Sequence, residues 1–341
     1  MKVGQKAENR RCLVTGGTGY LGGAMVREFL ADGWQVRCLV RPASDRSALP
    51  DGVEVATGDV TDPGSLGPAM ADVQLVCHSA ALVASWVRDR SLFERVNVGG
   101  TVNVFRAALE RAVPRVLYTS TFFALGPTDD VETADEEHAQ LDRRFYTDYE
   151  RSKTGALARV EGFVRRGLPV VTVMPGVIFG PGKATGGSLV NSLIDQAARG
   201  TLVPLVGTGR QRWCFAYVKD VARGHLLAAE RGGAGERYLL GGENVALEDF
   251  FAMVGESAGR PWTLKTAPTW IGKLMTVPQF LRAWLGGRAP EFTPGGIETL
   301  VHSWAFSSEK ARRELGYHIT PIRTALQETL AWLKDIGREG V

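Results

Sequence analysis

A glycine-rich segment near the start of the chain constrains the fold more than any other feature. The segment Thr15–Gly22 (TGGTGYLG) lies between an apolar run, Arg11–Thr15, and an amphipathic run, Tyr20–Ala31. This context predicts a tight turn from a strand into a helix. Glycines spaced three residues apart permit close approach of the backbone to a phosphate and close packing of helix on strand. The first amides of the helix favour an anion, so the segment predicts a site for a dinucleotide pyrophosphate.

Short apolar runs alternate with longer helical patterns through the first half of the chain. Strands are predicted at Arg11–Thr15, Val36–Val40, Val53–Thr57, Leu75–His78, Arg115–Thr119 and Pro169–Met174. Apolar residues recur three and four positions apart in the predicted helices Tyr20–Ala31, Val96–Arg111 and Tyr149–Arg166. This alternation predicts an α/β fold, a doubly wound parallel sheet with helices on both faces.

The pattern becomes irregular after Met174, where loops are rich in glycine and proline. One further strand is predicted at Glu236–Leu240, and helices are predicted at Leu247–Ala258, Ser308–Leu315 and Pro321–Leu333. We therefore predict a cofactor-binding domain over residues 10–178, to which residues 214–242 return. Residues 179–213 and 243–341 are predicted to form a smaller C-terminal substrate-binding part.

Composition excludes several classes of protein. The 341 residues are 44% hydrophobic, which is enough for a sizeable core. Their formal charge of +3 is spread along the chain without the basic run that nucleic-acid binding requires. No segment reaches the roughly 18 apolar residues of a transmembrane helix, and the first residues lack the apolar stretch of a signal peptide.

The positions of the cysteines and histidines indicate the redox compartment of the protein and whether it binds a metal. The four cysteines lie in apolar runs without CxxC spacing, which predicts buried reduced thiols and fits a cytoplasmic protein: Cys12, Cys38, Cys77 and Cys214. The five histidines are isolated from one another and lack ligand spacing. No metal site is therefore predicted.

The residue after the second predicted strand bears on the choice of cofactor. An acidic residue at this point would favour NAD, whereas Arg41 offers charge-assisted hydrogen bonds to a 2′-phosphate. Ser44 and Arg46 in the following loop are candidates for further contacts. We expect NADP(H) to be preferred. NAD(H) stays open as the second choice, because Arg41 could equally be a solvated residue at a strand end.

Tyr149 and Lys153 carry the predicted chemistry. Their spacing of four puts both on one face of the helix after the fifth strand, and Thr121 stands at the end of that strand. A tyrosine, with an ordinary pKa of about 10, is a poor acid–base group at neutral pH unless a nearby ammonium favours the phenolate. We expect Tyr149 to exchange a proton with the substrate, Lys153 to lower the pKa of Tyr149, and Thr121 to hold the substrate oxygen.

Several motifs together resemble the extended short-chain dehydrogenase/reductase family, in its dihydroflavonol-reductase-like and 3β-hydroxysteroid-dehydrogenase-like branch. They cover nearly the whole chain: TGGTGYLG at 15–22, GDVTDP at 58–63, HSAA at 78–81, NVGGT at 97–101, YTST at 118–121, YERSK at 149–153, PGVIFGPG at 175–182 and YVKDVARGHLLA at 217–228. The resemblance implies a Rossmann-type fold and an NAD(P)-dependent oxidoreductase. It also implies catalytic roles for Thr121, Tyr149 and Lys153.

The predicted cofactor site combines the glycine-rich turn, Arg41 and the ends of the following strands. Its residues are Gly16, Thr18, Gly19, Tyr20, Leu21, Gly22, Arg41, Asp59, Val60, Ser79, Ala80, Ala81, Thr119, Ser120, Tyr149, Lys153, Pro175, Gly176 and Val177. Asp59 has an alternative interpretation as a turn-forming residue.

Departures from the family bear on the substrate. The arginine that holds a pyrophosphate in sugar-nucleotide relatives is replaced by Trp213, although Arg212 is adjacent. Dehydratases of the family follow the catalytic threonine with Asp-Glu, where this chain has Phe122 and Phe123. A dehydratase is therefore disfavoured. We expect Trp86, Phe122, Phe123 and Trp213 to line an apolar substrate pocket, with some of these rings serving as ordinary core.

Three functions stay open on the sequence. The first is an NADP(H)-dependent reductase or dehydrogenase of an apolar or aromatic ketone or alcohol. The second is an NAD-dependent nucleotide-sugar epimerase, which Trp213 and Arg41 disfavour. The third is a non-catalytic NADP-sensing protein, which the pair Tyr149 and Lys153 disfavours.

Two further expectations concern surfaces. The amphipathic segment Thr269–Gly286, interrupted by Pro278, is predicted to pack over the substrate, with contact to a membrane surface as the alternative. The resemblance implies a homodimer through residues 96–111 and 149–166.

Overall fold

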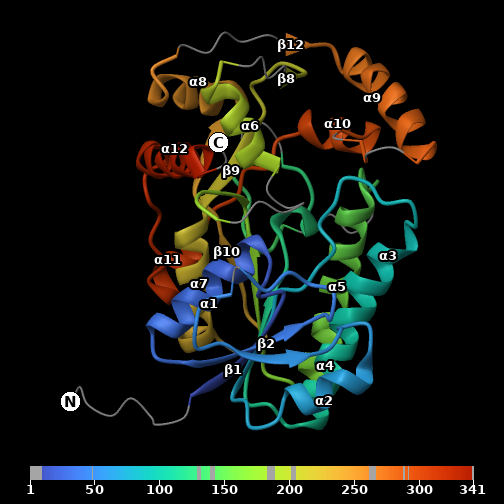
Figure 1. The fold of residues 1–341 in the computed structure, drawn as a ribbon, viewed down its shortest axis with the longest axis vertical. Helices are drawn as coiled ribbons and strands as arrows, with labels where there is room; N and C mark the ends of the chain where they lie inside the picture. The colour runs from blue at the N-terminus through green and yellow to red at the C-terminus, as the bar shows by residue number, and fades with distance from the viewer. Residues whose placement is uncertain are drawn as a thin grey trace.

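The computed structural model describes residues 10–47, 49–128, 132–138, 143–182, 189–200, 205–260, 266–286, 289–290 and 292–339. A seven-stranded sheet forms its centre, in the order β10-β6-β5-β4-β1-β2-β3, and every neighbouring pair is parallel (Figure 1). The strands are β1 (Arg11–Thr15), β2 (Gln35–Val40), β3 (Glu54–Thr57), β4 (Leu75–His78), β5 (Val116–Thr119), β6 (Val170–Pro175) and β10 (Arg237–Leu240). All seven were predicted to within one residue at each end, so the doubly wound α/β fold is confirmed.

Helices cover both faces of the sheet. One face packs on α1 (Tyr20–Ala31), α7 (Val218–Arg231) and α11 (Glu309–Leu315), and the other on α2 (Pro63–Ala69), α4 (Gly100–Glu110) and α5 (Asp148–Arg165). Alternate residues of β1 divide between the two cores: Cys12 and Val14 join the first, and Leu13 joins the second. Burial on both faces explains why the strands are continuous apolar runs. It also confirms that the four cysteines are buried and free.

The predicted helix at 96–111 contains a change of helix type. After α3 (Ser91–Phe93), residues Glu94–Gly99 form a π-helical turn, η1, before α4 begins. The side chain of Asn97 in η1 is buried and bonds both backbone groups of Leu82 (2.7 and 3.1 Å) and the hydroxyl of Ser152 on α5 (2.8 Å). The wider turn thus ties the loop after β4 to α5, and such insertions are frequent at functional sites.

The remaining elements gather over the carboxyl ends of the sheet strands (Figure 1). They include a sheet β11-β9-β7 (Glu243–Ala246, Arg212–Tyr217, Val177–Phe179) and a pair β12-β8 (Thr266–Ala267, Leu205–Val206). Their helices are α6 (Leu189–Ala198), α8 (Leu247–Ser257), α9 (Thr269–Trp284), α10 (Pro294–Leu300) and α12 (Ile322–Glu339). The exception is α11, which packs beside α7 and β10 although it was assigned to the smaller part. The exact domain boundaries stay a prediction.

No described helix is both long and apolar enough to cross a lipid bilayer.

The turn into α1 depends on the absence of a side chain at Gly22. A Cβ atom there would lie 2.0 Å from the carbonyl oxygen of Gly16, whereas one at Gly23 would have no neighbour nearer than 3.7 Å. We predict that Gly22→Ala destabilises the protein by about 1–3 kcal/mol, the usual cost of overpacking. Gly23→Ala should be neutral or stabilise the helix by up to about 1 kcal/mol. Urea denaturation of both variants checks this, and equal stabilities would contradict the packing argument.

Candidate active site

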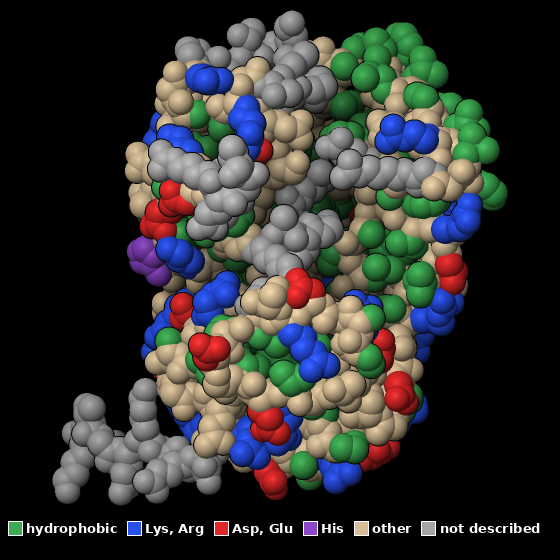
Figure 2. All heavy atoms as spheres, viewed as in Figure 1, with side chains coloured by type: hydrophobic (Ala, Val, Ile, Leu, Met, Phe, Trp, Pro, Cys, Tyr) green, Lys and Arg blue, Asp and Glu red, His purple; other side chains and the backbone are tan. Residues whose placement is uncertain are grey.

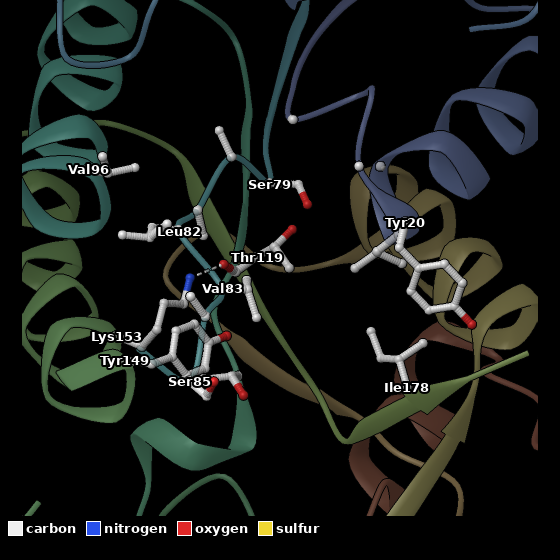
Figure 3. A pocket seen from close by; sticks show the side chains of 18 of the residues that line it. Tyr20, Ser79, Leu82, Val83, Ser85, Val96, Thr119, Tyr149, Lys153 and Ile178 are labelled. Carbon is white, nitrogen blue, oxygen red and sulfur yellow. Dashed lines mark hydrogen bonds between the residues drawn. The ribbon is translucent and has the colours of Figure 1, made fainter. Parts of the chain in front are cut away.

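A cleft of about 2280 Å³ runs along the carboxyl ends of the sheet strands, between the sheet and α6, α9, α10 and α12. All nineteen residues assigned to the cofactor in the sequence line this cleft, and so do Thr121, Phe122, Phe123 and Trp213. The glycine-rich turn and the aromatic residues Phe123 and Trp213 thus line one and the same cavity. Figure 3 shows part of its wall, with Tyr20 from α1 across the cavity from Tyr149 and Lys153 of α5.

The glycine-rich turn presents uncapped amides to the cleft. Gly19 precedes α1 in an extended conformation with no side-chain cap, and the first turn of the helix has no acidic residue. The amides of Tyr20, Leu21 and Gly22 come too early in the helix to have partners within it. Gly16 has φ +79°, and a Cβ there would lie 2.8 Å from the nitrogen of Ala80. The turn therefore fits the pyrophosphate of a dinucleotide, whose negative charge such a helix start favours.

Arg41 lies at the end of β2, exposed and on the cleft wall together with Ser44. Arg46 is not among the residues that line the cleft. Asp59 lies on the same wall, but one carboxylate oxygen accepts hydrogen bonds from the amide and the hydroxyl of Thr61, both 2.8 Å. Asp59 therefore shapes its turn, as the alternative interpretation held, while remaining beside the cavity.

The start of α5 determines where Tyr149 lies. Thr147 caps the helix by accepting a hydrogen bond from the amide of Glu150, and the Glu150 carboxylate accepts from the amide of Thr147 in return. This reciprocal cap places Tyr149 in the first turn, partly exposed at the cleft. One turn later, Lys153 is 4% exposed, and its ammonium nitrogen donates to the carbonyl of Thr119 at 2.7 Å (Figure 3).

The electrostatics of this group differ from the sequence expectation. Burial lowers the pKa of Lys153 to about 7, and burial raises the pKa of Tyr149 to about 12, partly offset by a hydrogen bond with Thr121. The ammonium of Lys153 lies over the ring of Tyr118, 4.9 Å from its centre, and bonds the Thr119 carbonyl, with no bond to the Tyr149 phenol. The expected lowering of the Tyr149 pKa by Lys153 is therefore not found.

A buried ion pair behind Tyr149 was missed in the sequence. The guanidinium of Arg143 pairs with Glu150, and both side chains are less than a tenth exposed. Arg143 also donates to the carbonyl of Phe123 at 2.8 Å. The pair thus fastens the start of α5 to the turn that carries Phe122 and Phe123. The capping pattern Thr147-x-x-Glu150 could have indicated the position of Glu150. No local pattern indicates that Arg143 is the partner of Glu150.

Aromatic rings form the other end of the cleft. Phe123 lies edge-on between Trp213, at 6.0 Å, and Trp304, at 4.7 Å. Phe122 is 1% exposed and packs beneath Phe123, so it belongs mainly to the core. Trp304 is fully buried against Phe123 and was missed, because only the tertiary structure brings its segment next to that ring.

The structure does not bring Trp86 to this wall. Trp86 is not among the residues that line the cleft, and its ring contacts Phe280 of α9 at 6.3 Å. Arg212 is not on the cleft wall either; its backbone amide donates to the hydroxyl of Ser303. The aromatic end is therefore built by Phe123 and Trp213 with Leu300 of α10.

Comparison with known proteins agrees with the class that this fold and cleft define, a dinucleotide-dependent enzyme with a Rossmann-type sheet. The chain belongs to the NAD-dependent epimerase/dehydratase family, whose model matches residues 12–241. It is an NAD(P)-dependent oxidoreductase of the extended short-chain dehydrogenase/reductase type.

Three relatives illustrate the range of similarity. Sterol demethylase protein B of Methylococcus capsulatus is 34% identical over 95% of this chain and 98% of its own. The 4-hydroxy-2-methyl-3-oxo-4-farnesyl-3,4-dihydroquinoline-1-oxide ketoreductase of Stigmatella aurantiaca is 32% identical over 97% of each chain. The crystal structure of gox2253 superposes with a TM-score of 0.82 and 35% identity, covering 97% of this chain and 99% of the other.

The burial of Lys153 gives a pH-dependent prediction. Its pKa falls from an ordinary 10.5 to about 7 in the folded protein, so between these values the unfolded chain holds a proton that the folded chain lacks. The free energy of unfolding contributed by this group therefore rises with pH between 7 and 10.5. We predict that the stability of the parent chain relative to Lys153→Met increases from pH 7 to pH 9 in urea denaturation without cofactor. A difference independent of pH would contradict the low pKa.

Proposed function

We propose that this enzyme is an NADP(H)-dependent reductase or dehydrogenase that transfers a hydride between nicotinamide and a carbonyl or alcohol of an apolar or aromatic substrate. The observation that carries the proposal is the continuity of the cleft from the uncapped amides of the glycine-rich turn to the aromatic wall of Phe123 and Trp213. Tyr149 and Thr121 lie between these two ends, where a substrate oxygen would meet them.

Thr121, Tyr149 and Lys153 have separate roles in this proposal. Thr121 hydrogen-bonds Tyr149 and orients the substrate oxygen, and Tyr149 donates or accepts the proton at that oxygen. Lys153, held by the Thr119 carbonyl, supplies the cation beside the phenol and a donor for the nicotinamide ribose. The bound cofactor supplies or takes up the hydride. With the cleft filled, the ammonium favours the phenolate more strongly, because water no longer screens the two groups.

The preference for NADP(H) rests on Arg41. Its side chain is exposed on the cleft wall at the end of β2, and no ion pair is recorded for it among the described residues. A free guanidinium matches the 2′-phosphate of the adenosine ribose, and Ser44 on the same wall adds a hydroxyl.

The substrate class rests on the far end of the cleft. Phe123, Trp213 and Leu300 favour burial of apolar area, worth about 25 cal/mol per Å². A diphosphate at this place would need cations, and Arg212 lies off the wall. Two of the relatives, a sterol demethylase protein and a ketoreductase of a farnesyl quinoline oxide, are named for large apolar substrates, which also supports this class. Phe122 contributes by supporting Phe123 from beneath, and Trp86 acts indirectly through Phe280 of α9.

The second candidate is an NAD-dependent nucleotide-sugar epimerase. The family description favours it, and Arg282 of α9 lies on the cleft wall as a cation for a phosphate. Arg95 lies there too, but pairs with Asp89 at 2.8 Å. We rank this candidate second because Trp213 stands at the position of the pyrophosphate-binding arginine and because Arg41 favours NADP(H).

Activity assays separate the two candidates. Nicotinamide absorbance is followed with NADPH and with NADH against small, aromatic and polycyclic ketones, beside an assay for interconversion of UDP-sugars. The proposal expects oxidation of NADPH with the larger apolar ketones. Saturable binding and epimerisation of a UDP-sugar, with no ketone reduced, would reverse the ranking.

Replacement of Tyr149 tests the proton transfer. We predict that Tyr149→Phe lowers kcat about 10²- to 10⁴-fold, the usual contribution of general acid–base catalysis, and leaves cofactor affinity intact. Tyr146→Phe is the matched control, because Tyr146 stacks on His302 outside the residues that line the cleft. Substantial turnover by Tyr149→Phe would remove this residue from the mechanism.

Replacement of Arg41 tests the cofactor preference. We predict that Arg41→Ala weakens NADPH binding by about 1.5–3 kcal/mol, the range for a hydrogen bond to a charged group, and leaves NADH binding nearly unchanged. Arg46→Ala is the control, since Arg46 lies in the same loop but off the cleft wall. Fluorescence titration with each nucleotide gives the four affinities, and equal losses for both nucleotides would exclude the contact with the 2′-phosphate.

A further inference from the structure

The exposed hydrophobic side chains of this protein are concentrated on one helix. Nine large hydrophobic side chains are exposed in the described residues, and seven of them lie in or directly after α9: Trp270, Leu274, Met275, Val277, Leu281, Trp284 and Leu285. Their exposed fractions run from 57% to 81%. Figure 2 shows the hydrophobic area over this helix, at the upper right of the molecule. Scattered single residues would need no explanation, but a cluster of this kind marks an interaction surface.

The cluster forms a stripe along the helix. Residues 270, 274, 277, 281 and 284 are spaced by three or four, so they lie on one face, which we call the α9 stripe. The opposite side holds the helix to the protein: Gly272, Thr276 and Ala283 are buried, and Pro278, Gln279 and Arg282 line the cleft. An ordinary surface helix turns its apolar face inward, whereas α9 is attached through small and polar residues and turns its apolar face outward.

The charged side chains within the segment that carries the stripe are all basic. From Lys265 to Pro290 the sequence contains four basic residues and no Asp or Glu. Lys273 pairs with Glu298 of α10, while Arg282 lies at the rim of the cleft. Outside the segment, Arg88 donates to the carbonyl of Trp284 at 2.9 Å and adds another cation at the end of the helix.

We propose that α9 docks in the plane of an anionic lipid surface. An outward apolar stripe with basic neighbours matches the acyl boundary and the headgroups of such a surface. Trp270 and Trp284 stand at the two ends of the stripe, and tryptophan is enriched at the boundary between lipid and water. The helix has 16 residues and includes Pro278, so it lies on the bilayer without crossing it.

The residues of α9 that cover the cleft are not those of the α9 stripe. The side of α9 that faces the cleft already contributes Pro278, Gln279 and Arg282 to its wall, so the sequence expectation that this segment packs over the cavity agrees with the structure. The stripe lies on the other side of the helix and needs a separate occupant. Because α9 packs against α10, which contributes Leu300 to the aromatic end, an apolar substrate dissolved in the lipid would have a short path into the cleft; this last point rests on the proposed function.

Vesicle binding tests the docking. The full chain is sedimented with vesicles of equimolar phosphatidylcholine and phosphatidylglycerol and with vesicles of phosphatidylcholine alone. We expect binding to the anionic vesicles that weakens at high salt. The double variant Leu274→Asp/Leu281→Asp should lower the partition coefficient by about tenfold or more, since each leucine loses about 1.5–3 kcal/mol of burial. Val55→Asp, which places a single added aspartate at an exposed valine of β3, should bind as the parent chain does.

Folding, oligomeric state and activity are measured alongside. Equal melting temperatures of the parent and double variant would show that lost vesicle binding comes from the surface. No binding of the parent chain to either vesicle would overturn the proposal. So would a lipid-free dimer of the parent chain that the double variant converts to monomer, because a second copy would then cover the stripe. Reduction of an aromatic ketone supplied without vesicles should be the same in parent and variant. Absence of reduction in both chains across the whole ketone panel would overturn the proposed function and leave the docking standing.

Discussion

Parallel pairing of the seven strands places all their carboxyl ends at one edge of the sheet, and every part of the candidate site depends on this arrangement. β1 ends in the glycine-rich turn, β2 ends at Arg41, and β5 ends just before Thr121. These residues are separated in the chain by the helices that cover the sheet, yet they share one cleft because strands of the same direction end together. This placement depends on backbone direction alone, because the carboxyl end of a reversed strand would lie at the opposite edge of the sheet.

The electrostatics of the site also follow from its place at this edge of the sheet. Uncapped amides at the start of α1 and the exposed Arg41 make one end of the cleft suitable for phosphates. Further along, burial acts against charge, lowering the pKa of Lys153 and raising that of Tyr149. Lys153 therefore loses its proton near neutral pH, and Tyr149 keeps its proton there. A bound cofactor with a negative charge would shift this balance toward the charged ammonium, which links cofactor binding to the readiness of Tyr149 for proton transfer.

The aromatic end of the cleft is assembled from distant parts of the chain. Phe123 follows β5, Trp213 belongs to β9, and Trp304 comes from the loop after α10. The buried pair of Arg143 and Glu150 holds the Phe123 turn against the start of α5, so the aromatic wall and Tyr149 are positioned together. α9 packs against α10, which contributes Leu300 to this end, and its outward stripe is apolar like the wall.

The sequence by itself determined the parts of this protein that depend on neighbouring residues. Strand positions followed from apolar runs, the phosphate turn from TGGTGYLG, and the shared face of Tyr149 and Lys153 from their spacing of four, because backbone geometry relates such residues directly. Only the tertiary structure decided that the Lys153 ammonium bonds the Thr119 carbonyl and that Trp86 packs on Phe280 away from the cleft. It also decided that the amphipathic segment 269–286 turns its apolar side outward. Each of these outcomes depends on which residues, distant in the sequence, come into contact in the folded chain. Local sequence patterns do not determine those contacts.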